Sequence, residues 1–387
     1  MSIKDKFAIA GVGYTPSKNP PGRTSLSFHL EACANAIADA GLGKEDIDGL
    51  ICYRHFPAAS NENDLTPFVV AQHLGISPAY IGMDANCSRN HLQAALGALN
   101  AGLCNYLLIS FGHNPKSSDS ILKLLGEFTG DDAVFGSFGA TGNYALAARR
   151  AMHEYRTGPD TWKQIAVGQR KWANLNPDAV MYGKPLTEED YLNHKWFVEP
   201  FRLPDNCLMN DGGRAVLLTS VERARDLKHR PAVIMGIGSD NPSTDIKQSR
   251  SMAGPSGARK ASEAAFAMAG VTVRDVDACE IYDCFTFTVE LTLQDYGFFA
   301  PGEGEDWFRG GTIEPGGRMP VNTSGGLLSE GYYMGLTPLS EAAMQLMGRC
   351  GQRQLGEATK TKSPEIIICS DNGGILQSHT CCILGRL

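Results

Sequence analysis

Cysteine and histidine side chains stand at several points where helical or glycine-rich segments begin. Cys87 precedes an apolar helical stretch, and a helix start stabilises a thiolate and so activates a thiol as a nucleophile. His91 falls in the same stretch, while His113 and His379 follow strand-like runs beside glycine-rich segments, where active-site groups gather in α/β proteins. These residue types could support acyl transfer or proton transfer. Each could also be a packed core side chain.

The composition limits the function classes. The 387 residues are 43% hydrophobic, enough for two ordinary cores, and carry a net charge of -7 with dispersed basic residues. Neither nucleic acid nor a membrane is therefore an expected partner. No apolar run reaches the roughly 18 residues that span a bilayer, and the first residues lack a secretory signal, so we expect a cytoplasmic protein.

The eleven cysteines form no C-x-x-C pair, and Cys381 and Cys382 lie in a strand-like apolar run. We interpret the cysteines as reduced and mostly packed. We expect neither a metal ion nor a tightly bound cofactor.

The chain repeats itself. AIAGVG at residues 8–13 and VIMGIG at residues 233–238 both predict a buried strand that ends in a glycine turn. A helix and a short strand follow each of them, and five identities are then 229 positions apart: Ala40 and Ala269, Gly41 and Gly270, Asp46 and Asp275, Asp48 and Asp277, Tyr53 and Tyr282. An ungapped match of this kind indicates two homologous halves.

We expect an N-terminal half at residues 1–230 and a C-terminal half at residues 231–387. Between about residues 113 and 205 the pattern changes to helical segments mixed with proline, asparagine and charged loops. This stretch is interpreted as an insertion in the first half. Such insertions at the active end of α/β sheets often build substrate sites.

Two further strings complete the pattern: EIYDCF at residues 280–285 and NTSGGLLSEGYYMG at residues 322–335. Together with the repeat and the insertion, they resemble the thiolase superfamily over essentially the whole chain. The second string matches the N-x-x-G-G-x-x-x-x-G-H-P-x-G motif at Asn322, Gly325, Gly326, Gly331 and Gly335. The resemblance is strongest to the sterol-carrier-protein-type thiolases and the lipid-transfer-protein aldolases. It implies a duplicated five-layer αβαβα fold.

The chain departs from ordinary thiolases at the positions that carry their chemistry. Tyr282 stands where the N-E-A-F motif has its asparagine, and Tyr332 stands where the second motif has its histidine, two groups that form an oxyanion hole in thiolases. Cys87 lies two residues away from the position of the nucleophilic cysteine. In the string SDNGG at residues 370–374, Ser370 takes the place of the acid/base cysteine, with Cys369 adjacent.

The resemblance to the aldolase branch implies retro-aldol cleavage, by a carbon–carbon lyase, of a bulky 3-hydroxyacyl-coenzyme A, such as one with a steroid side chain. The products would be a ketone or aldehyde and a short acyl-coenzyme A. Coenzyme A would enter as part of the substrate. The alternatives are a thiolase or acetyltransferase that uses Cys87, and an acyl-coenzyme A-binding scaffold without activity. The resemblance also implies a homodimer and a partner with an OB fold and zinc ribbon.

We assign the site residues on these motifs and patterns. Tyr332 is interpreted as general base or enolate stabiliser, with Tyr282 as its partner. The expected catalytic group is Tyr332, Tyr282, Asp283, Cys87, His91 and Asn322. The expected substrate contacts are Gly325, Gly326, Gly331, His113, Gly373, Gly374 and His379.

Overall fold

A nine-stranded mixed sheet forms the centre of the molecule. The computed structural model describes residues 2–16, 22–53, 65–84, 91–118, 134, 139–242, 249 and 251–387. In this part of the chain, the sheet has the order β3-β2-β4-β7-β1-β8-β11-β10-β9. Its first-half strands are β1 (Phe7–Tyr14), β2 (Gly49–Tyr53), β3 (Tyr80–Asp84), β4 (Leu107–His113) and β7 (Gly212–Ser220). Its second-half strands are β8 (Ala232–Asp240), β9 (Ala278–Glu280), β10 (Ile366–Gly373) and β11 (Ser378–Arg386).

The same strand order occurs twice in this sheet. In the first half the neighbouring strands are β2-β4-β7-β1, and in the second half the equivalent order is β9-β10-β11-β8. Strand β3 adds one more strand at the edge of the first set. The sets meet where β1 lies antiparallel to β8, in a ladder of two residue pairs among the described residues, Ala8 with Val233 and Ile9 with Ala232. The boundary that we propose near residue 230 falls between α9 (Val221–Ala224) and β8.

Two equivalent acidic residues of the sequence repeat, Asp48 and Asp277, make equivalent hydrogen bonds to the backbone. The Asp48 carboxylate accepts the backbone N–H groups of residues 105–106, just before β4, at 2.8–2.9 Å. The Asp277 carboxylate accepts those of residues 365–366 at the start of β10, at 2.8 and 3.1 Å. Each carboxylate therefore satisfies backbone donors where two neighbouring strands begin.

The glycines of the two repeated strand motifs let a helix pack directly on a strand. A Cβ atom on Gly13 would lie 2.0 Å from the carbonyl oxygen of Ala32 in α1 (Ser25–Ala40). A Cβ atom on Gly238 would lie 2.1 Å from the carbonyl oxygen of Ala261 in α10 (Gly257–Ala269). Both positions exclude any side chain because backbone meets backbone there.

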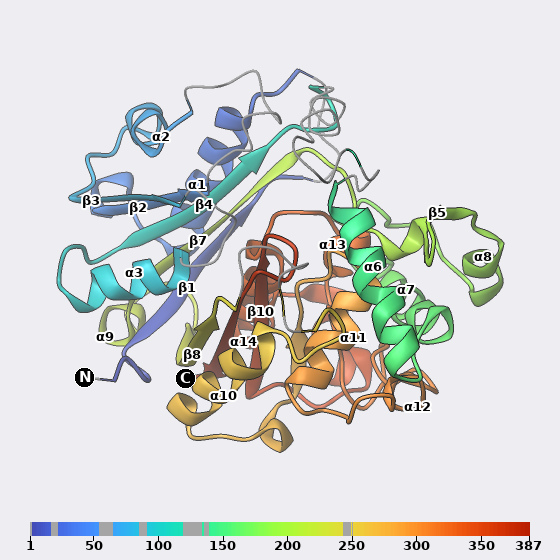
Figure 1. Ribbon diagram of the computed structural model, residues 1–387. Helices are drawn as coiled ribbons and strands as arrows, with labels where there is room; N and C mark the ends of the chain where they lie inside the picture. Colours follow the sequence, from blue (N-terminus) through green and yellow to red (C-terminus); the bar gives the residue numbers. More distant parts are fainter. Residues whose placement is uncertain are drawn as a thin grey trace.

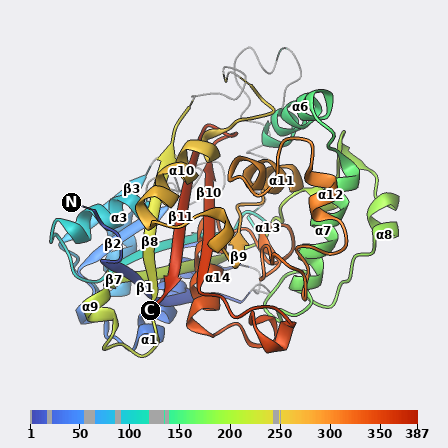
Figure 2. The same ribbon diagram turned by 90° about the horizontal axis from the view of Figure 1, so that it is seen from below.

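Helices complete five layers, as the family resemblance implied. In Figure 1, α1 and α2 (Pro67–Leu74) lie outside the first-half strands, and in Figure 2, α10 covers the second-half strands. Between the two sets lie α3 (His91–Asn100) and α14 (Leu336–Met347), and α14 contacts strands of both halves. Alternation along the strands serves these layers: Ile109 belongs to the central core, whereas Leu108 belongs to the outer one. In the part of the chain described here, no helix has the length and apolar character needed to cross a membrane.

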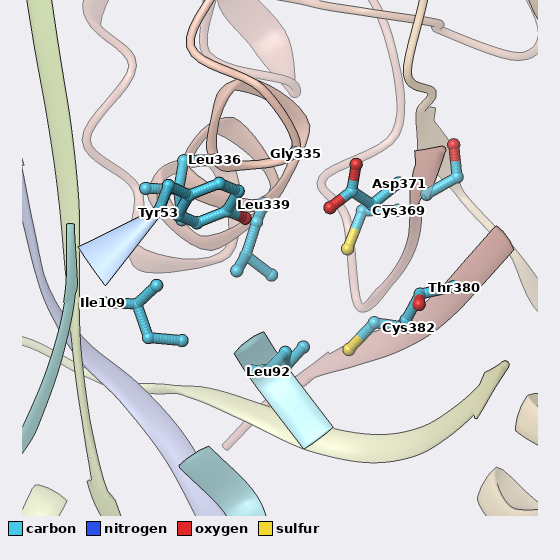
Figure 3. Close-up of a pocket in the computed structure, with 11 residues that line it drawn as sticks. Tyr53, Leu92, Ile109, Gly335, Leu336, Leu339, Cys369, Asp371, Thr380 and Cys382 are labelled. Carbon is cyan, nitrogen blue, oxygen red and sulfur yellow. The ribbon is translucent and has the colours of Figure 1, made fainter. Parts of the chain in front are cut away.

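A small cavity of about 30 Å³ remains in the central layer (Figure 3). Apolar side chains of the first half and of α14 line one part of it, namely Leu92, Ile109, Leu336 and Leu339, together with the ring of Tyr53. Polar and sulfur-containing side chains of β10 and β11 line the other part: Cys369, Ser370, Asp371, Thr380 and Cys382. The cavity therefore has an apolar side and a polar side, and the polar side carries a carboxylate, hydroxyls and thiols.

The inserted segment of the first half packs against the second half. It contains α6 (Gly139–Glu154), α7 (Pro159–Ala173), α8 (Glu188–Asn193), β5 (Trp196–Val198) and β6 (Phe201–Arg202). Its helix α7 contacts α11 (Thr286–Asp295), α12 (Gly304–Phe308) and α13 (Gly326–Ser329) (Figure 1). The Glu290 carboxylate in α11 accepts the indole N–H of Trp162 at 2.8 Å. The insertion thus covers the half in which the two tyrosine motifs lie.

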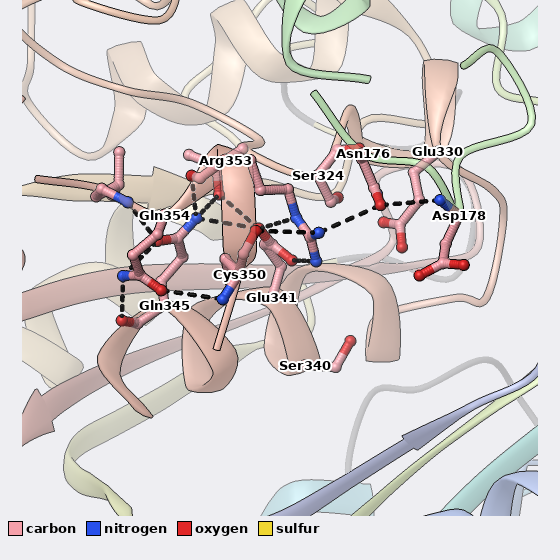
Figure 4. A network of polar contacts seen from close by, with 12 residues as sticks. Asn176, Asp178, Ser324, Glu330, Ser340, Glu341, Gln345, Cys350, Arg353 and Gln354 are labelled. Carbon is pink, nitrogen blue, oxygen red and sulfur yellow. Dashed lines mark hydrogen bonds and ion pairs between the residues drawn. The ribbon is translucent and has the colours of Figure 1, made fainter. Parts of the chain in front are cut away.

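A buried polar network holds the loop that begins the second motif (Figure 4). The Arg353 guanidinium donates to both carboxylate oxygens of Glu341 in α14, at 2.9 and 3.0 Å. The Thr323 hydroxyl is 2.9 Å from the same carboxylate, and Asn176 of the insertion joins Arg353 to the carbonyl of Ser324. Helix α14, the insertion and this loop are therefore tied together through charge-assisted hydrogen bonds.

Replacing Arg353 by leucine should destabilise the fold strongly. The side chain of Glu341 is fully buried, so its charge would lose its partner without gaining water. We expect a loss of about 3–5 kcal/mol in the free energy of unfolding, measured in urea. Lys362→Ala is the control, because that exposed lysine pairs with Asp277 at the surface and should cost less than about 1 kcal/mol. Equal effects of the two variants would contradict this interpretation.

Candidate active site

Two tyrosine hydroxyls meet at the centre of the candidate site. Tyr282 lies between β9 and α11, and Tyr332 lies in the turn between α13 and α14. Their hydroxyl oxygens are 2.8 Å apart, and their rings meet edge to face with centroids at 6.3 Å. The Met334 sulfur lies 3.0 Å from the Tyr332 hydroxyl and 3.8 Å from that of Tyr282. The structure therefore brings together the two residues that replace the thiolase asparagine and histidine.

Backbone hydrogen bonds position Tyr282. Its N–H donates to the Ser370 hydroxyl at 2.9 Å. Just before it, the Asn322 side chain accepts the N–H of Ile281 at 2.6 Å and donates to the carbonyl of the same residue at 3.0 Å. Both ends of the Asn322 amide thus contact the main chain. Asn322 and Ser370 therefore position the backbone at residues 281–282 by hydrogen bonds.

Asp283 faces α13, away from the tyrosine hydroxyls. Its carboxylate accepts the backbone N–H groups of Leu327 and Leu328 at 2.9 and 3.1 Å. Burial raises the pKa of Asp283 to about 8, although these two hydrogen bonds act in the opposite direction. A Cβ atom on Gly326 would lie 2.3 Å from this carboxylate. Asp283 therefore holds the start of α13 by two hydrogen bonds. A side chain at residue 326 would collide with its carboxylate, so that position requires glycine.

The other glycines of the second motif are buried against protein atoms. A Cβ atom on Gly325 would lie 2.6 Å from the Cβ of Ala173, and one on Gly331 would lie 2.9 Å from the ring of Tyr333. Both glycines therefore leave room for neighbouring protein atoms that a side chain would displace. At the end of β10, the Gly374 carbonyl is 3.4 Å from the Tyr144 hydroxyl of α6, so residues 373–374 lie beside the insertion.

Of the expected histidines, one lies near Tyr332 and one stacks on a residue that lines the cavity. The His113 ring, at the end of β4, has its centroid 6.1 Å from that of Tyr332. His91 stacks on Tyr53, with ring centroids 3.9 Å apart and planes at 15°, and Tyr53 lines the cavity. Both histidines are buried. Cys87 lies outside the residues that the structure describes.

His379 lies on the other face of the second-half sheet. Its Nε2 atom is 2.6 Å from the Tyr296 hydroxyl, and its Nδ1 atom is 2.5 Å from the side-chain oxygen of Asn372. Its Cβ is close to Gly257 of α10 in the outer layer. Burial lowers the pKa of His379 to about 3, so the ring is neutral. The structure therefore separates His379 from the tyrosine pair.

The sequence patterns missed Asp371. It stands between Ser370 and Asn372 in β10, and its carboxylate points into the cavity beside Cys369 (Figure 3). Residues two apart in a strand face the same side, so alternation from Cys369 could have identified it.

The thiols in this region are poor nucleophiles. A hydrogen bond with Cys382, and then burial, raise the pKa of Cys369 well above its usual value. Burial likewise raises the pKa of Cys382's neighbour Cys381. These thiols stay protonated at neutral pH, whereas nucleophilic attack needs a thiolate. In the described part of the site, the available chemistry is thus hydrogen-bond donation by two phenols beside a carboxylate.

Comparison with known proteins agrees with this arrangement. Residues 238–386 match the family model described as thiolase C-terminal domain-like. The chain is 34% identical to the steroid side-chain-cleaving aldolase of Thermomonospora curvata, covering 88% of this chain and 90% of that protein. It is also 34% identical to the 17-hydroxy-3-oxo-4-pregnene-20-carboxyl-CoA lyase of Mycobacterium tuberculosis, covering 89% and 92%.

A solved structure shows the same fold. The Ltp2-ChsH2(DUF35) aldolase superposes with a TM-score of 0.85 at 31% identity, covering 99% of this chain and 98% of that one. Together with the sequence relatives, it confirms the resemblance that the two motifs predicted. The chain therefore belongs to the thiolase superfamily, in the branch that contains the thiolase-fold aldolases.

Proposed function

We propose that the protein is a carbon–carbon lyase that cleaves a bulky 3-hydroxyacyl-coenzyme A, with a steroid side chain as the substrate class. The hydrogen-bonded hydroxyls of Tyr282 and Tyr332, 2.8 Å apart, carry this proposal. The relatives named as a steroid side-chain-cleaving aldolase and a pregnene-carboxyl-CoA lyase support the substrate class. The products are a ketone or aldehyde and a shortened acyl-coenzyme A.

Retro-aldol cleavage needs donors for the enolate of the thioester. As the bond between C2 and C3 breaks, its electron pair moves onto the thioester carbonyl, and C2 must then receive a proton. Burial, and then the neighbouring Tyr332, raise the pKa of Tyr282 well above its usual value. The phenol is therefore protonated at neutral pH. We assign the tyrosine pair to hydrogen-bond donation to the enolate and to proton delivery at C2.

Protein partners form a second part of the proposal. Strand β3 is the open edge of the first half, and thiolase-like chains are expected to dimerise there. A small partner with an OB fold and zinc ribbon is the second expected component, in line with the two-part name of the similar aldolase structure. We place this assembly in the cytoplasm, with coenzyme A present as part of the substrate.

Tyr332→Phe should lower kcat by about 10²- to 10³-fold, because it removes one preorganised donor from the enolate. The affinity for the thioester, measured by calorimetry, should stay unchanged. Tyr182→Phe is the matched control, since Tyr182 is exposed and lies in the insertion. If Tyr332→Phe cleaved substrate at the parental rate, the tyrosine pair would be a packing feature. Thioester binding without turnover, by the parent and the variant alike, would make the chain a binding scaffold.

Product analysis by mass spectrometry should distinguish a lyase from a thiolase. With a panel of 3-hydroxyacyl and 3-ketoacyl thioesters, we expect a shorter acyl-coenzyme A plus a ketone or aldehyde from the hydroxy compounds, without free coenzyme A. The assay should be run with and without the partner protein. Cleavage of the keto compounds that requires free coenzyme A, with acylated Cys87, would overturn the proposed function.

A further inference from the structure

A short segment of the first half, just before β7, contacts both loops that carry the tyrosines. The N–H of Cys207 donates to the carbonyl of Cys284, two residues after Tyr282, at 3.0 Å. The side-chain oxygen of Asn210 accepts the N–H of Tyr332 at 2.7 Å. Three residues of extended chain reach at most about 11 Å, so this segment limits how far the two loops can lie apart.

The amide of Asn210 is buried, and only its oxygen is bonded to protein in the described residues. Asn210 is 2% exposed, and its nitrogen has no hydrogen-bond partner among the residues that the structure describes. Burying a donor without a partner costs stability, so the fold as a whole gains little from an asparagine at this place. This favours a role in holding the main chain of Tyr332 over a role in stability.

Strand β7 holds the same turn through two further residues. The guanidinium of Arg214 is 2.5 Å from a carboxylate oxygen of Glu330, two residues before Tyr332. The central carbon of this guanidinium lies 4.8 Å from the centre of the Tyr333 ring. A Cβ atom on Gly212 would lie 2.7 Å from the same ring. The strand therefore contacts residues before and after Tyr332.

The contact between the two phenols depends on where this turn lies. The hydroxyl oxygens of Tyr282 and Tyr332 are 2.8 Å apart. At about 3.6 Å they would no longer be hydrogen-bonded. Because the tyrosine ring is rigid, a shift of the main chain at residue 332 is passed on to its hydroxyl. A group that fixes this main chain therefore also fixes the tyrosine pair.

We propose that Asn210 is a positioning residue for the lyase reaction. It holds the main chain of Tyr332 so that the hydroxyl of this residue stays within hydrogen-bond distance of Tyr282. The role rests on the proposed function, in which the tyrosine pair serves the enolate. Asn210 acts through Tyr332 and takes no part in bond breaking or proton transfer. The first half of the chain thereby controls the geometry of two groups of the second half.

The first test compares Asn210→Leu with Asn210→Asp on a 3-hydroxyacyl thioester that the parent cleaves, with the partner protein present. The leucine variant loses the acceptor, so kcat should fall by about 10- to 100-fold while thioester affinity, measured by calorimetry, stays unchanged. The aspartate variant keeps an oxygen at this place and should keep a kcat close to that of the parent. Equal losses in both variants would show that the amide nitrogen matters instead, which would overturn the proposal.

Asn174→Leu is the matched control. The side-chain oxygen of Asn174, just after α7, also accepts a backbone N–H, that of Gly183 at 3.1 Å. This variant removes the same kind of contact at a place that does not hold either tyrosine loop, so kcat should stay unchanged. A loss as large as that of Asn210→Leu would show that the effect is not specific to the Tyr332 turn.

A double-mutant cycle tests whether Asn210 acts through the phenol. In the Tyr332→Phe background the hydroxyl is already absent, so Asn210→Leu should cost little further activity. The combined loss should therefore be smaller than the product of the two single losses. The full loss in both backgrounds would show a general defect of the fold and contradict the positioning role.

Fluorine NMR of the protein without substrate separates this inference from the lyase assignment. With 3-fluorotyrosine throughout the chain, Tyr282→Phe and Tyr182→Phe assign the resonances of Tyr282 and of the exposed Tyr182. Asn210→Leu should move the Tyr282 resonance toward its value in Tyr332→Phe, because both changes remove the hydroxyl contact. The Tyr182 resonance should not move.

The two possible failures have different signatures. An unchanged Tyr282 resonance in Asn210→Leu would overturn the role of Asn210 and leave the lyase assignment intact. A parent enzyme that cleaves none of the 3-hydroxyacyl thioesters would remove the proposed function, whereas the resonance shift would still show that Asn210 positions the tyrosine pair.

Discussion

The buried ion pair between Glu341 and Arg353 determines where the site can form. Two buried charges must pair with each other, and their remaining donors and acceptors must form hydrogen bonds with other protein groups. Few arrangements of the neighbouring segments meet both conditions. Here the solution includes Thr323 and Asn176, so α14, the loop before the glycine-rich motif and the insertion share one geometry. Helix α14 begins directly after the turn that carries Tyr332. The position of Tyr332 therefore depends on an ion pair in the helix that follows it.

On this frame, the chemistry depends on a few side chains. The motif positions that hold an asparagine and a histidine in ordinary thiolases hold hydrogen-bonded tyrosines in this chain. The asparagine and histidine of thiolases and the two tyrosines of this chain can all donate hydrogen bonds. Burial raises the pKa of Tyr282, so its phenol keeps its proton at neutral pH. The surroundings raise the pKa values of the Cys369 and Cys381 thiols and so favour their protonated form. A scaffold for acyl transfer through a thiolate thus becomes one suited to enolate chemistry.

The sequence predicted two homologous halves because the signals of the repeat are local, and the family resemblance implied the five layers. Strand periodicity, paired glycines and acidic residues at one offset follow from backbone geometry. Motif positions also predicted that Tyr282 and Tyr332 belong to one site. The side-chain partners were harder to predict. That Asn322 binds the backbone of Ile281, and that His379 faces Tyr296, depends on tertiary contacts that no local pattern encodes. Asp371 was missed because the motif comparison drew attention to its neighbour Ser370.

The internal duplication has a further consequence for Tyr53 and Tyr282, which stand 229 positions apart in equivalent strand ends. Tyr53 stacks on His91 and forms a wall of the cavity, whereas Tyr282 pairs with a second phenol. In a symmetric assembly of two half-length chains, one mutation would change both tyrosine environments together. Covalent fusion of the halves removes this restriction. In a single chain, one copy can line the cavity while the other pairs with a second phenol, so the asymmetry of this site depends on having both halves in a single gene.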